Sequence, residues 1–310
     1  MITPIELFAQ QAVNGLSLGA MYALLALGFT LVYGILELIN FAHFNVFMIG
    51  SFVGLIVLQA LGIAGQSVVL HGAPLIFALL LALIVTMLVC GILGVLIERF
   101  TLRPMRGVRG PMAMITTIGV SYILYNVVLL ATNAQALNFP DPLATQDFDI
   151  HHVVIRAKQI LIWIISLILM VGLDQFVRRS RLGKAMRATA QDAEAARMMG
   201  VDVDRVVSTA FFAGSALAGA AGLIFGLYYN FTQYSIGYSA GLRAFTAAVL
   251  GGIGNVPGAM LGGILIGLIE TMSSQYIATK WADVIIFSIL ILVLVFKPAG
   301  LLGALAPNRS

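Results

Sequence analysis

The chain has 310 residues, of which 60% are hydrophobic and only 10% are charged, and its mean hydropathy is +1.02. An ordinary globular protein has about 25% charged residues, so this composition excludes a soluble domain. The net charge of +4 comes from a few short segments. It therefore indicates orientation in a membrane and not nucleic-acid binding.

Four long runs contain no Asp, Glu, Lys or Arg, namely 38–97, 110–140, 206–242 and 244–269. A transmembrane helix needs about 20 apolar residues, because a charge at the bilayer centre is costly. The runs therefore predict an all-α fold, a polytopic transmembrane helical bundle in which residues 1–310 form a single transmembrane domain.

The N-terminal stretch "MITPIELFAQQ" has no basic region and no small-residue cleavage site, so the first span is expected to be retained. Cys90, the one cysteine, is expected to be a small packed apolar residue. About eight or nine spans are expected, because 242–270 forms either two half-helices or a re-entrant hairpin. The predicted spans are 5–36, 44–63, 74–97, 111–131, 159–177, 206–228, 242–270 and 283–297.

Thirteen of the 17 basic residues lie in three segments: seven in 178–205, and the others at Arg99, Arg103, Arg106, Arg109, Lys297 and Arg309. Positively charged loops remain in the cytoplasm, so these three segments are expected to face inward. Segment 133–152 has three Asp and no Lys or Arg, and is expected outside. Its His151-His152 pair lacks matching ligands, so no metal site is expected. The side of the N-terminus stays open.

Two apolar segments are interrupted, one in each half of the chain. The first, "ELINFAHFNVFMIGSF", contains Asn40, His43 and Asn45, and the second, "AVLGGIGNVPGAMLGGILIG", contains Asn255 among glycines. Non-helical backbone at membrane depth is tolerated where it is buried in protein or lines a wet cavity. The two segments therefore predict either broken helices on a substrate pathway or close packing through small residues. His43 is either a hydrogen-bonded structural residue or a pathway residue.

The densest polar segment is "GKAMRATAQDAEAARMMGVDVDRV". Its spacing predicts one cytoplasmic helix over 182–200 that ends at Gly200, and Asp202 is expected to cap the next span. The segment is a solvated loop, an interfacial helix on lipid, or a docking element for a soluble subunit. The predicted apolar face consists of Leu182, Met186, Ala190, Ala193, Ala196 and Met199.

Within this segment, "EAARMMG" reads as Glu-Ala-Ala, three residues and Gly. It resembles the EAA loop of permease subunits in bacterial ATP-binding-cassette (ABC) importers, which docks onto the ATPase. The strings "RATAQDAEAARMMGVDVDRV", "INFAHFNVFMIGSF" and "AVLGGIGNVPGAMLGG" resemble, more narrowly, the H-type permease of branched-chain amino-acid (Liv) importers. The likeness covers nearly the whole chain, including its "KPAGLLG" ending.

The resemblance implies a permease domain with a cytoplasmic coupling loop at 178–205 and broken or re-entrant helices. It implies coupling contacts with the ATPase at Arg187, Gln191, Asp192, Glu194, Ala195 and Gly200. It implies a substrate pathway near Asn40, His43, Asn45 and Asn255. Two positions depart from the family pattern: the Ile-x-Leu-Pro expected after the EAA motif is replaced by "AFFA" from Ala210, and Phe44 stands where Gly is usual.

The implied partners are a second homologous permease in a heterodimer, two cytoplasmic ATPase subunits and a soluble periplasmic substrate-binding protein, in the bacterial inner membrane. The chain has no Walker A loop, so ATP is expected to bind to the ATPase partners and no cofactor to bind to this chain. Without a HExxH motif or an acid pair, the chain is not expected to be an enzyme. The expected cargo is branched-chain or related amino acids.

Three alternatives stay open. An ABC permease for urea or short amides has the same architecture, and a homodimer is not distinguished from a heterodimer by sequence. An ion-coupled secondary transporter is disfavoured, because its acidic residues belong within spans, whereas those of this chain lie at predicted span ends.

Overall fold

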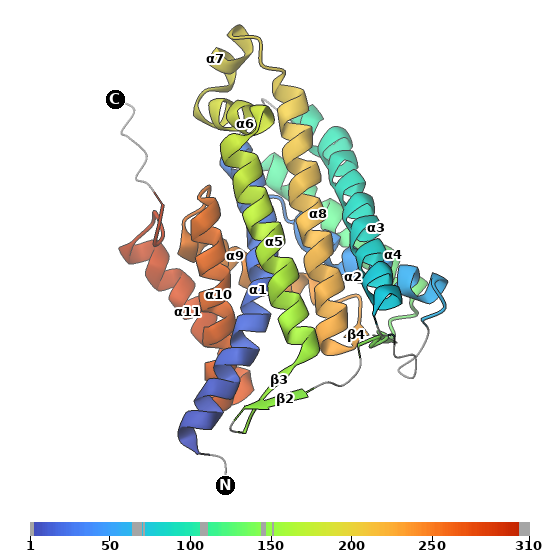
Figure 1. Ribbon diagram of the computed structural model, residues 1–310. Coiled ribbons are helices and arrows are strands. Elements are labelled where there is room, and N and C mark those ends of the chain that lie inside the picture. Colours follow the sequence, from blue (N-terminus) through green and yellow to red (C-terminus); the bar gives the residue numbers. More distant parts are fainter. Residues whose placement is uncertain are drawn as a thin grey trace.

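The computed structural model describes residues 3–63, 70, 72–105, 111–143, 147–150 and 152–303, and helices account for most of them (Figure 1). The long helices are α1 (Pro4–Leu36), α2 (Ala42–Ala60), α3 (Ala73–Ile97), α4 (Met112–Ala131), α5 (Ala157–Arg179), α8 (Val203–Tyr229), α9 (Ile236–Gly251), α10 (Val256–Ser273) and α11 (Thr279–Phe296). The shorter elements are α6 (Arg181–Gln191), α7 (Ala193–Met198), η1 (Glu98–Leu102), η2 (Arg103–Met105), η3 (Ser274–Ala278), β1 (Leu137–Asn138), β2 (Asp147–Ile150), β3 (Val153–Arg156) and β4 (Phe231–Thr232).

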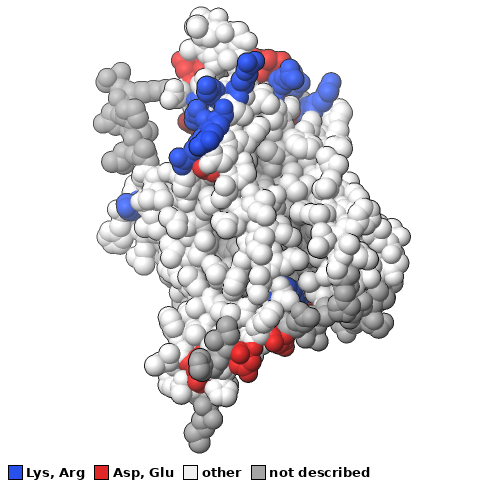
Figure 2. Space-filling view, in the orientation of Figure 1, with Lys and Arg blue, Asp and Glu red and all other residues white. Residues whose placement is uncertain are grey.

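The two ends of the molecule differ in charge. Most of the Lys and Arg side chains visible on this face gather around α6 at the upper end, together with some Asp and Glu, whereas the lower edge carries mainly Asp and Glu (Figure 2). By the positive-inside rule the α6–α7 end is predicted to be the cytoplasmic one. Helix α1 begins at the opposite end, which is then predicted to be the outer one (Figure 1). The predicted inward-facing residues Arg106, Arg109 and Arg309 lie outside the described part of the chain.

Seven helical stretches of the described chain are long and apolar enough to cross a membrane. The last of them, Val256–Phe296, contains both α10 and α11. Helix α9 has 16 residues and is shorter than a full span. The chain is thus a polytopic all-α membrane protein, as predicted, and the expectation of eight or nine crossings stays a prediction.

Helix α1 forms the centre of the bundle and packs most closely against α10. Both helices carry two glycines four residues apart, Gly15 and Gly19 in α1 and Gly263 and Gly267 in α10. A Cβ atom built on Gly19 would lie 2.7 Å from the Cα atom of Ile264, too close for any side chain. Small residues at this spacing let membrane helices approach backbone to backbone. The glycines of α10 therefore serve helix packing.

In the first interrupted segment, residues 37–41, the chain leaves α1 and folds back into the bundle before α2 begins; we call this segment the first return. Helix α1 ends at Glu37, which adopts a left-handed conformation with φ of 54°, and residues 38–41 are not helical. Helix α2 starts beside the middle of α1, where the His43 ring Nε2 lies 3.3 Å from the carbonyl oxygen of Leu25. Helix α2 thus begins near mid-depth in the bundle and not at its cytoplasmic end.

Two side chains satisfy the backbone of this return. The Oδ1 atom of Asn40 accepts a hydrogen bond from the Ala42 N–H at 3.1 Å. The hydroxyl of Thr117, in α4, accepts one from the Phe41 N–H at 3.2 Å. Buried backbone without such partners would be costly. These contacts explain how a non-helical segment persists at this depth.

A second return follows α8. Helix α8 ends at Asn230, which is also left-handed with φ of 59°. Strand β4 then pairs with β1, and the Thr232 and Ser51 hydroxyls are hydrogen-bonded. Helix α9 starts against the beginning of α2, since a Cβ atom on Gly237 would lie 2.6 Å from Asn45 Oδ1. Two helices that run in opposite directions therefore begin side by side inside the bundle.

The second interrupted segment expected from sequence, around Asn255, does not lie at mid-depth in the bundle. Residues 252–255 form a turn between α9 and α10 at the cytoplasmic end, with positive φ at Gly252 and Gly254. The C-terminal segment pairs with it, as Leu301 N–H donates to the Leu250 carbonyl at 2.8 Å. The structural counterpart of the first return is thus 230–235. A match of hydropathy patterns cannot find it, because it depends on strand pairing with distant residues.

Candidate translocation and coupling sites

A cavity of about 660 Å³ lies where α2 and α9 begin, against α4. No charged residue is among its lining residues in the described chain. Five of them are aromatic, and the edge of Tyr125 meets the ring of Tyr234 with 5.2 Å between centroids. The lining residues are Phe41, Phe44, Asn45, Ile118, Ser121, Tyr122, Tyr125, Ser235, Tyr238 and Ser239. The cavity is thus amphipathic and electrically neutral.

Asn45 is the most enclosed polar residue of the cavity wall, with 4% of its surface exposed. Its Nδ2 donates to the Ser121 carbonyl at 2.8 Å and to the Ser121 hydroxyl at 2.6 Å. Its Oδ1 has no hydrogen-bond partner among the described residues. A buried acceptor without a partner is uncommon in native proteins, so this atom is a candidate ligand contact.

Phe44, which departs from the family pattern, is 2% exposed and lines the cavity. Its ring lies directly against Gly241 of α9 and is 6.2 Å, centroid to centroid, from Phe29. The glycine at 241 leaves the room that the ring at 44 occupies. Phe44 therefore both narrows the cavity and packs α2 on α9.

The face around this cavity is polar for a surface at membrane depth. Tyr122 and Tyr238 are 64% and 66% exposed, and Asn126 and Ser239 are also exposed. Exposed polar groups are unfavourable against lipid chains. This face consequently fits coverage by another protein better than coverage by lipid.

The four predicted pathway residues separate into three positions. Asn45 lines the cavity, whereas Asn40 and His43 are buried behind it, at 4% and 1% exposure, and hold the α1–α2 return. Asn255 lies apart at the cytoplasmic end, where its Oδ1 accepts from Gly258 N–H at 3.1 Å and its Nδ2 donates to the Leu302 carbonyl at 2.6 Å. Of the two roles considered for His43, a hydrogen-bonded structural residue and a pathway residue, this buried position fits the structural one.

Sequence reasoning missed Ser235, Tyr238 and Ser239. They lie in "NFTQYSIGYS", a polar and aromatic stretch inside the charge-free run 206–242. Its first two letters repeat the Asn-Phe of the first return, "NFAHF". Two features of the sequence could have indicated this part of the cavity: polar residues inside a charge-free run, and the Asn-Phe pair that occurs in both segments.

The helix predicted over 182–200 is wrong, because the structure has two helices there. Asp192 has an extended backbone, with φ of −157°, and ends α6. Its carboxylate accepts hydrogen bonds from the N–H groups of Glu194 and Ala195, both at 2.9 Å, and so starts α7. An aspartate at this position competes with helix continuation by capping a new one. The expected ends are confirmed: Gly200 has φ of 84°, and Asp202 caps α8.

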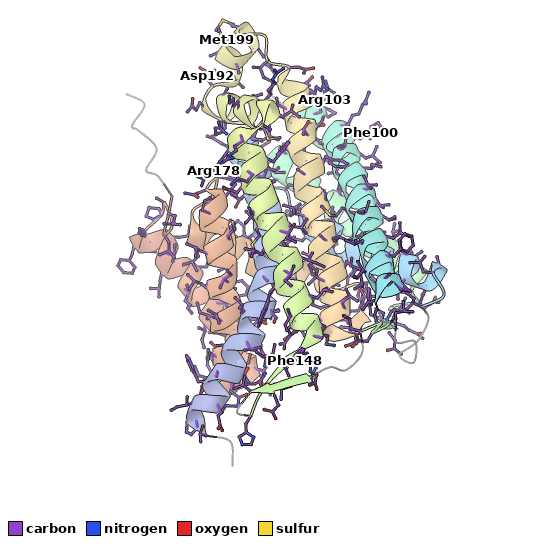
Figure 3. The ribbon with its side chains drawn as sticks, in the orientation of Figure 1. Phe100, Arg103, Phe148, Arg178, Asp192 and Met199 are labelled. Carbon is purple, nitrogen blue, oxygen red and sulfur yellow. The ribbon has the colours of Figure 1, made fainter. Side chains whose placement is uncertain are left out.

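The break also divides the predicted apolar face. Met186 and Ala196 are buried, at 2% and 6% exposure. Met198 and Met199 are 82% and 85% exposed, and Met199 lies at the tip of the molecule (Figure 3). A single helix would have turned Met199 toward the bundle, whereas the turn at Asp192 directs it into solvent. The result is an apolar tip at the cytoplasmic end.

The remaining predicted coupling residues lie in α6 and α7. The Arg187 guanidinium donates to the carbonyl oxygens of Val177 and Arg178 and thereby fastens α6 to α5. Gln191 and Glu194 are exposed and Ala195 is partly exposed. The structure thus brings all six predicted coupling residues into one protruding element, α6–α7, with its turns at Asp192 and Gly200.

Loss of the Asp192 cap gives a first testable prediction. Asp192→Ala is expected to destabilise α7 by about 1 kcal/mol, because two N–H groups lose their acceptor. Amide hydrogen exchange should then be faster in 193–198 and unchanged in α8. Asp192→Asn is the matched control and should retain most of the protection. Equal exchange in all three proteins would contradict the capping role.

Comparison with known proteins identifies the family of this chain. The sequence profile of the permease component of branched-chain amino acid transport systems matches residues 11–294. The chain is 41% identical over 300 residues to the high-affinity branched-chain amino acid transport system permease protein BraD of Pseudomonas aeruginosa, covering 96% of each. The chain belongs to the branched-chain amino acid permease family.

Other relatives extend this result. The corresponding permease protein LivH of Escherichia coli is 41% identical over 303 residues, with 96% of each chain covered. A probable LivH of the archaeon Methanocaldococcus jannaschii is 27% identical and covers 90% of this chain and 88% of its own. No solved structure matches the chain. The predicted resemblance to the H-type permeases is thus confirmed.

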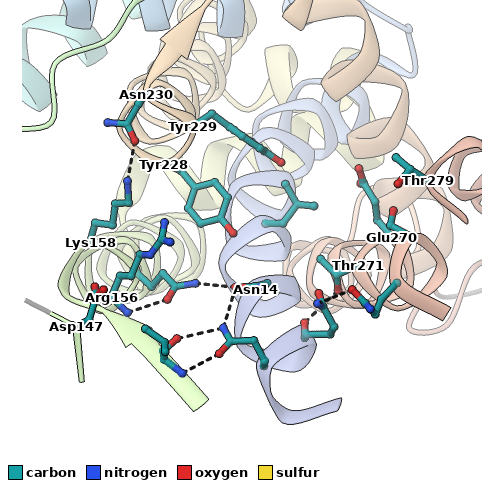
Figure 4. Close-up of a pocket in the computed structure, with 17 residues that line it drawn as sticks. Asn14, Asp147, Arg156, Lys158, Tyr228, Tyr229, Asn230, Glu270, Thr271 and Thr279 are labelled. Carbon is teal, nitrogen blue, oxygen red and sulfur yellow. Dashed lines mark hydrogen bonds between the residues drawn. The ribbon is translucent and has the colours of Figure 1, made fainter. Parts of the chain in front are cut away.

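The outer end of the permease holds a second cavity, of about 940 Å³, between α1, α5, the end of α8 and α10 (Figure 4). Lys158 lies on one wall, where its Nζ donates to Asn230 Oδ1 at 2.7 Å and pairs with Asp141 at 3.1 Å. Glu270 lies on the opposite wall (Figure 4). The cavity is thus a polar vestibule, with Asp147, Arg156 and Lys158 on one side and Glu270 on the other.

Behind Glu270, the permease contains an ionic cluster between α9, α10 and α11. Arg243 is the one charged residue in 206–269. Its guanidinium lies 3.4 Å from the Glu270 carboxylate and 2.7 Å from that of Asp283. The Tyr22 hydroxyl of α1 donates to Glu270 at 2.8 Å. The cluster therefore joins four helices through one cation.

Arg243→Gln is expected to destabilise the permease by about 3 kcal/mol, because Glu270 loses its cation in a mostly enclosed place. Asp283→Asn should cost no more than about 1 kcal/mol, since that carboxylate is 57% exposed. Thermal unfolding of the detergent-solubilised protein measures both. Equal effects of the two substitutions would show that the enclosed Arg243–Glu270 pair is not the important one.

Proposed function

We propose that this chain is the membrane-spanning permease subunit of an ABC importer for branched-chain or related amino acids in the bacterial inner membrane. The observation that carries the proposal is the protruding α6–α7 element, which presents the EAA motif and an apolar tip on a chain 41% identical to permeases of such systems. The chain itself performs no covalent chemistry in this proposal, and ATP is hydrolysed by two cytoplasmic ATPase subunits.

The second permease would cover the polar face around the mid-depth cavity. Tyr122, Tyr238 and Ser239 then line a route between two subunits and are shielded from lipid. A homologous partner brings its own α2, α4 and α9 to the other side of the route. The substrate-binding protein would approach the outer end, where the N-terminus and β2–β3 lie (Figure 1).

The packing supports a mechanical route from ATPase to cavity. The backbone of Gly183 in α6 lies against the end of α5, because a Cβ atom there would be 2.5 Å from the Phe176 carbonyl oxygen. After α7, the chain turns at Gly200 directly into α8. Helix α8 packs backbone to backbone on α1 at Gly214 and Gly28, next to His43. Movement of α6–α7 would thus be passed to the start of α2.

Transport in proteoliposomes tests this function. The complete importer should take up leucine only with internal ATP, and uptake should persist when ion gradients are collapsed. Uptake driven by a gradient without ATP would favour an ion-coupled transporter and overturn the proposal. Competition by urea and acetamide tests the alternative cargo, which is supported only if one of these solutes is itself accumulated.

A further inference from the structure

We propose that the mid-depth cavity binds both charged groups of an α-amino acid side by side, the ammonium at Asn45 Oδ1 and the carboxylate at the first turn of α9. This inference rests on the proposed transport function and adds to it a binding site and a mode of recognition. Because no charged side chain of the described chain lines the cavity, the net-neutral zwitterion is recognised by the dipoles of an amide group and of a helix N-terminus.

The acceptor side is fixed by Ser121. Both polar contacts of the Asn45 amide group are made by Nδ2, which donates to the Ser121 carbonyl and hydroxyl. The amide is thereby oriented with Oδ1 toward α9, and this oxygen has no partner among the described residues. An amide oxygen accepts and cannot donate. Its natural ligand is therefore a donor such as an ammonium group.

The donor side is the start of α9. Its N-cap Ser235 makes no side-chain capping hydrogen bond. The Ile236 N–H donates to the Gln233 carbonyl at 3.4 Å, so the next N–H groups of the first turn are the ones without a side-chain acceptor. The N-terminus of a helix carries partial positive charge and binds anions. The hydroxyls of Ser235 and Ser239 line the same cavity. At the start of α2, by contrast, Asn40 and Thr117 already occupy backbone donors.

The spacing of the two sides selects the ligand class. Asn45 Oδ1 lies next to the α9 backbone, 2.6 Å from where a Cβ atom of Gly237 would be. Acceptor and donors are therefore neighbours, as are the ammonium and carboxylate of an α-amino acid, which share one carbon atom. The aromatic wall, including Phe41, Phe44 and Tyr238, is suited to an aliphatic side chain.

The first turn of α9 covers Oδ1 in this structure, since the oxygen is buried against Gly237. Binding therefore requires the start of α9 to move away from α2. The Arg243 cluster holds the same helix to α10 and α11. The site thus links substrate recognition to separation of the two mid-depth helix starts.

Thiol protection in the assembled importer tests the site. Cys90 is fully buried, so Ser239→Cys introduces an accessible thiol at the cavity in this chain. Its rate of labelling by a small maleimide is measured with L-leucine, with isovalerate, which lacks the ammonium, and with isoamylamine, which lacks the carboxylate. Leucine is expected to slow labelling at least fivefold, and each analogue less than twofold.

Two substitutions in the Ser239→Cys background separate recognition from folding. Asn45→Leu should reduce protection by leucine to the level of isovalerate. Asn45→Thr can still donate to the Ser121 carbonyl but lacks Oδ1, so it should lose the protection as well, which covers the case in which the leucine variant fails to fold. Ile118→Val is the matched control, because it shortens another side chain of the cavity wall that takes no part in the proposed polar contacts.

Equal protection by leucine and isovalerate, or full protection in a folded Asn45→Leu variant, would overturn the site. ATP-driven leucine uptake is measured on the same preparations. Normal uptake without protection rejects this site and leaves the proposed function intact, whereas absence of ATP-driven uptake in the unmodified importer rejects the proposed function itself.

Discussion

Replacing Met198 and Met199 with glutamate is expected to abolish ATP-dependent uptake while the permease remains folded and inserted. Both side chains are more than four-fifths exposed at the tip of α7, so they contribute little to the stability of this chain. Methionine is enriched in protein interfaces because its flexible side chain adapts to a partner surface. We therefore expect these two residues to be central contacts of the ATPase.

Burial of a charged side chain at the centre of an interface should weaken ATPase binding by at least about 2 kcal/mol, or roughly 30-fold. Co-purification of the ATPase and the transport rate both measure the effect. Gln175→Glu is a suitable control, because it adds a negative charge at an exposed position of α5 below the tip. Wild-type ATPase binding by the Met198 and Met199 double variant would show that the tip is not the contact.

Gly267→Ala is expected to destabilise the bundle by about 2–3 kcal/mol, although it adds only one methyl group. That methyl would meet the backbone of Gly19 and the carbonyl oxygen of Gly15, the latter at 2.6 Å. Backbone atoms cannot rotate away as a side chain can, so α1 and α10 must separate. Every other contact along this interface then loses packing.

Gly172→Ala is the matched control, because a Cβ atom at this position of α5 would meet nothing within 4 Å. Alanine has a higher helix propensity than glycine, so this substitution should be neutral or stabilise by up to about 1 kcal/mol. Thermal unfolding and expression in the membrane compare the two variants. A neutral Gly267→Ala variant would mean that α1 and α10 do not pack through their glycines.

The sequence alone determined the class of this protein and predicted its orientation in the membrane. The long apolar stretches predicted spans that coincide with α3, α4, α5 and α8, because hydropathy is a property of the local sequence. The basic segment 178–205 predicted the cytoplasmic end for the same reason. The EAA spacing predicted a coupling role for this segment, which stays a prediction, and Gly200 and Asp202 marked where the segment ends, since capping involves residues only a few positions apart.

Only the tertiary structure decided where helices begin in depth and which polar atoms remain unpaired. Run 206–242 has no charge to mark the return at 230–235, which is held by pairing of β4 with β1 and by the Ser51–Thr232 hydrogen bond. Asn45 and Asn255 look alike in sequence, yet one side-chain oxygen is buried against α9 without a hydrogen-bond partner among the described residues and the other caps α10. These differences arise from partners far away in the chain, and local pattern carries no information about them.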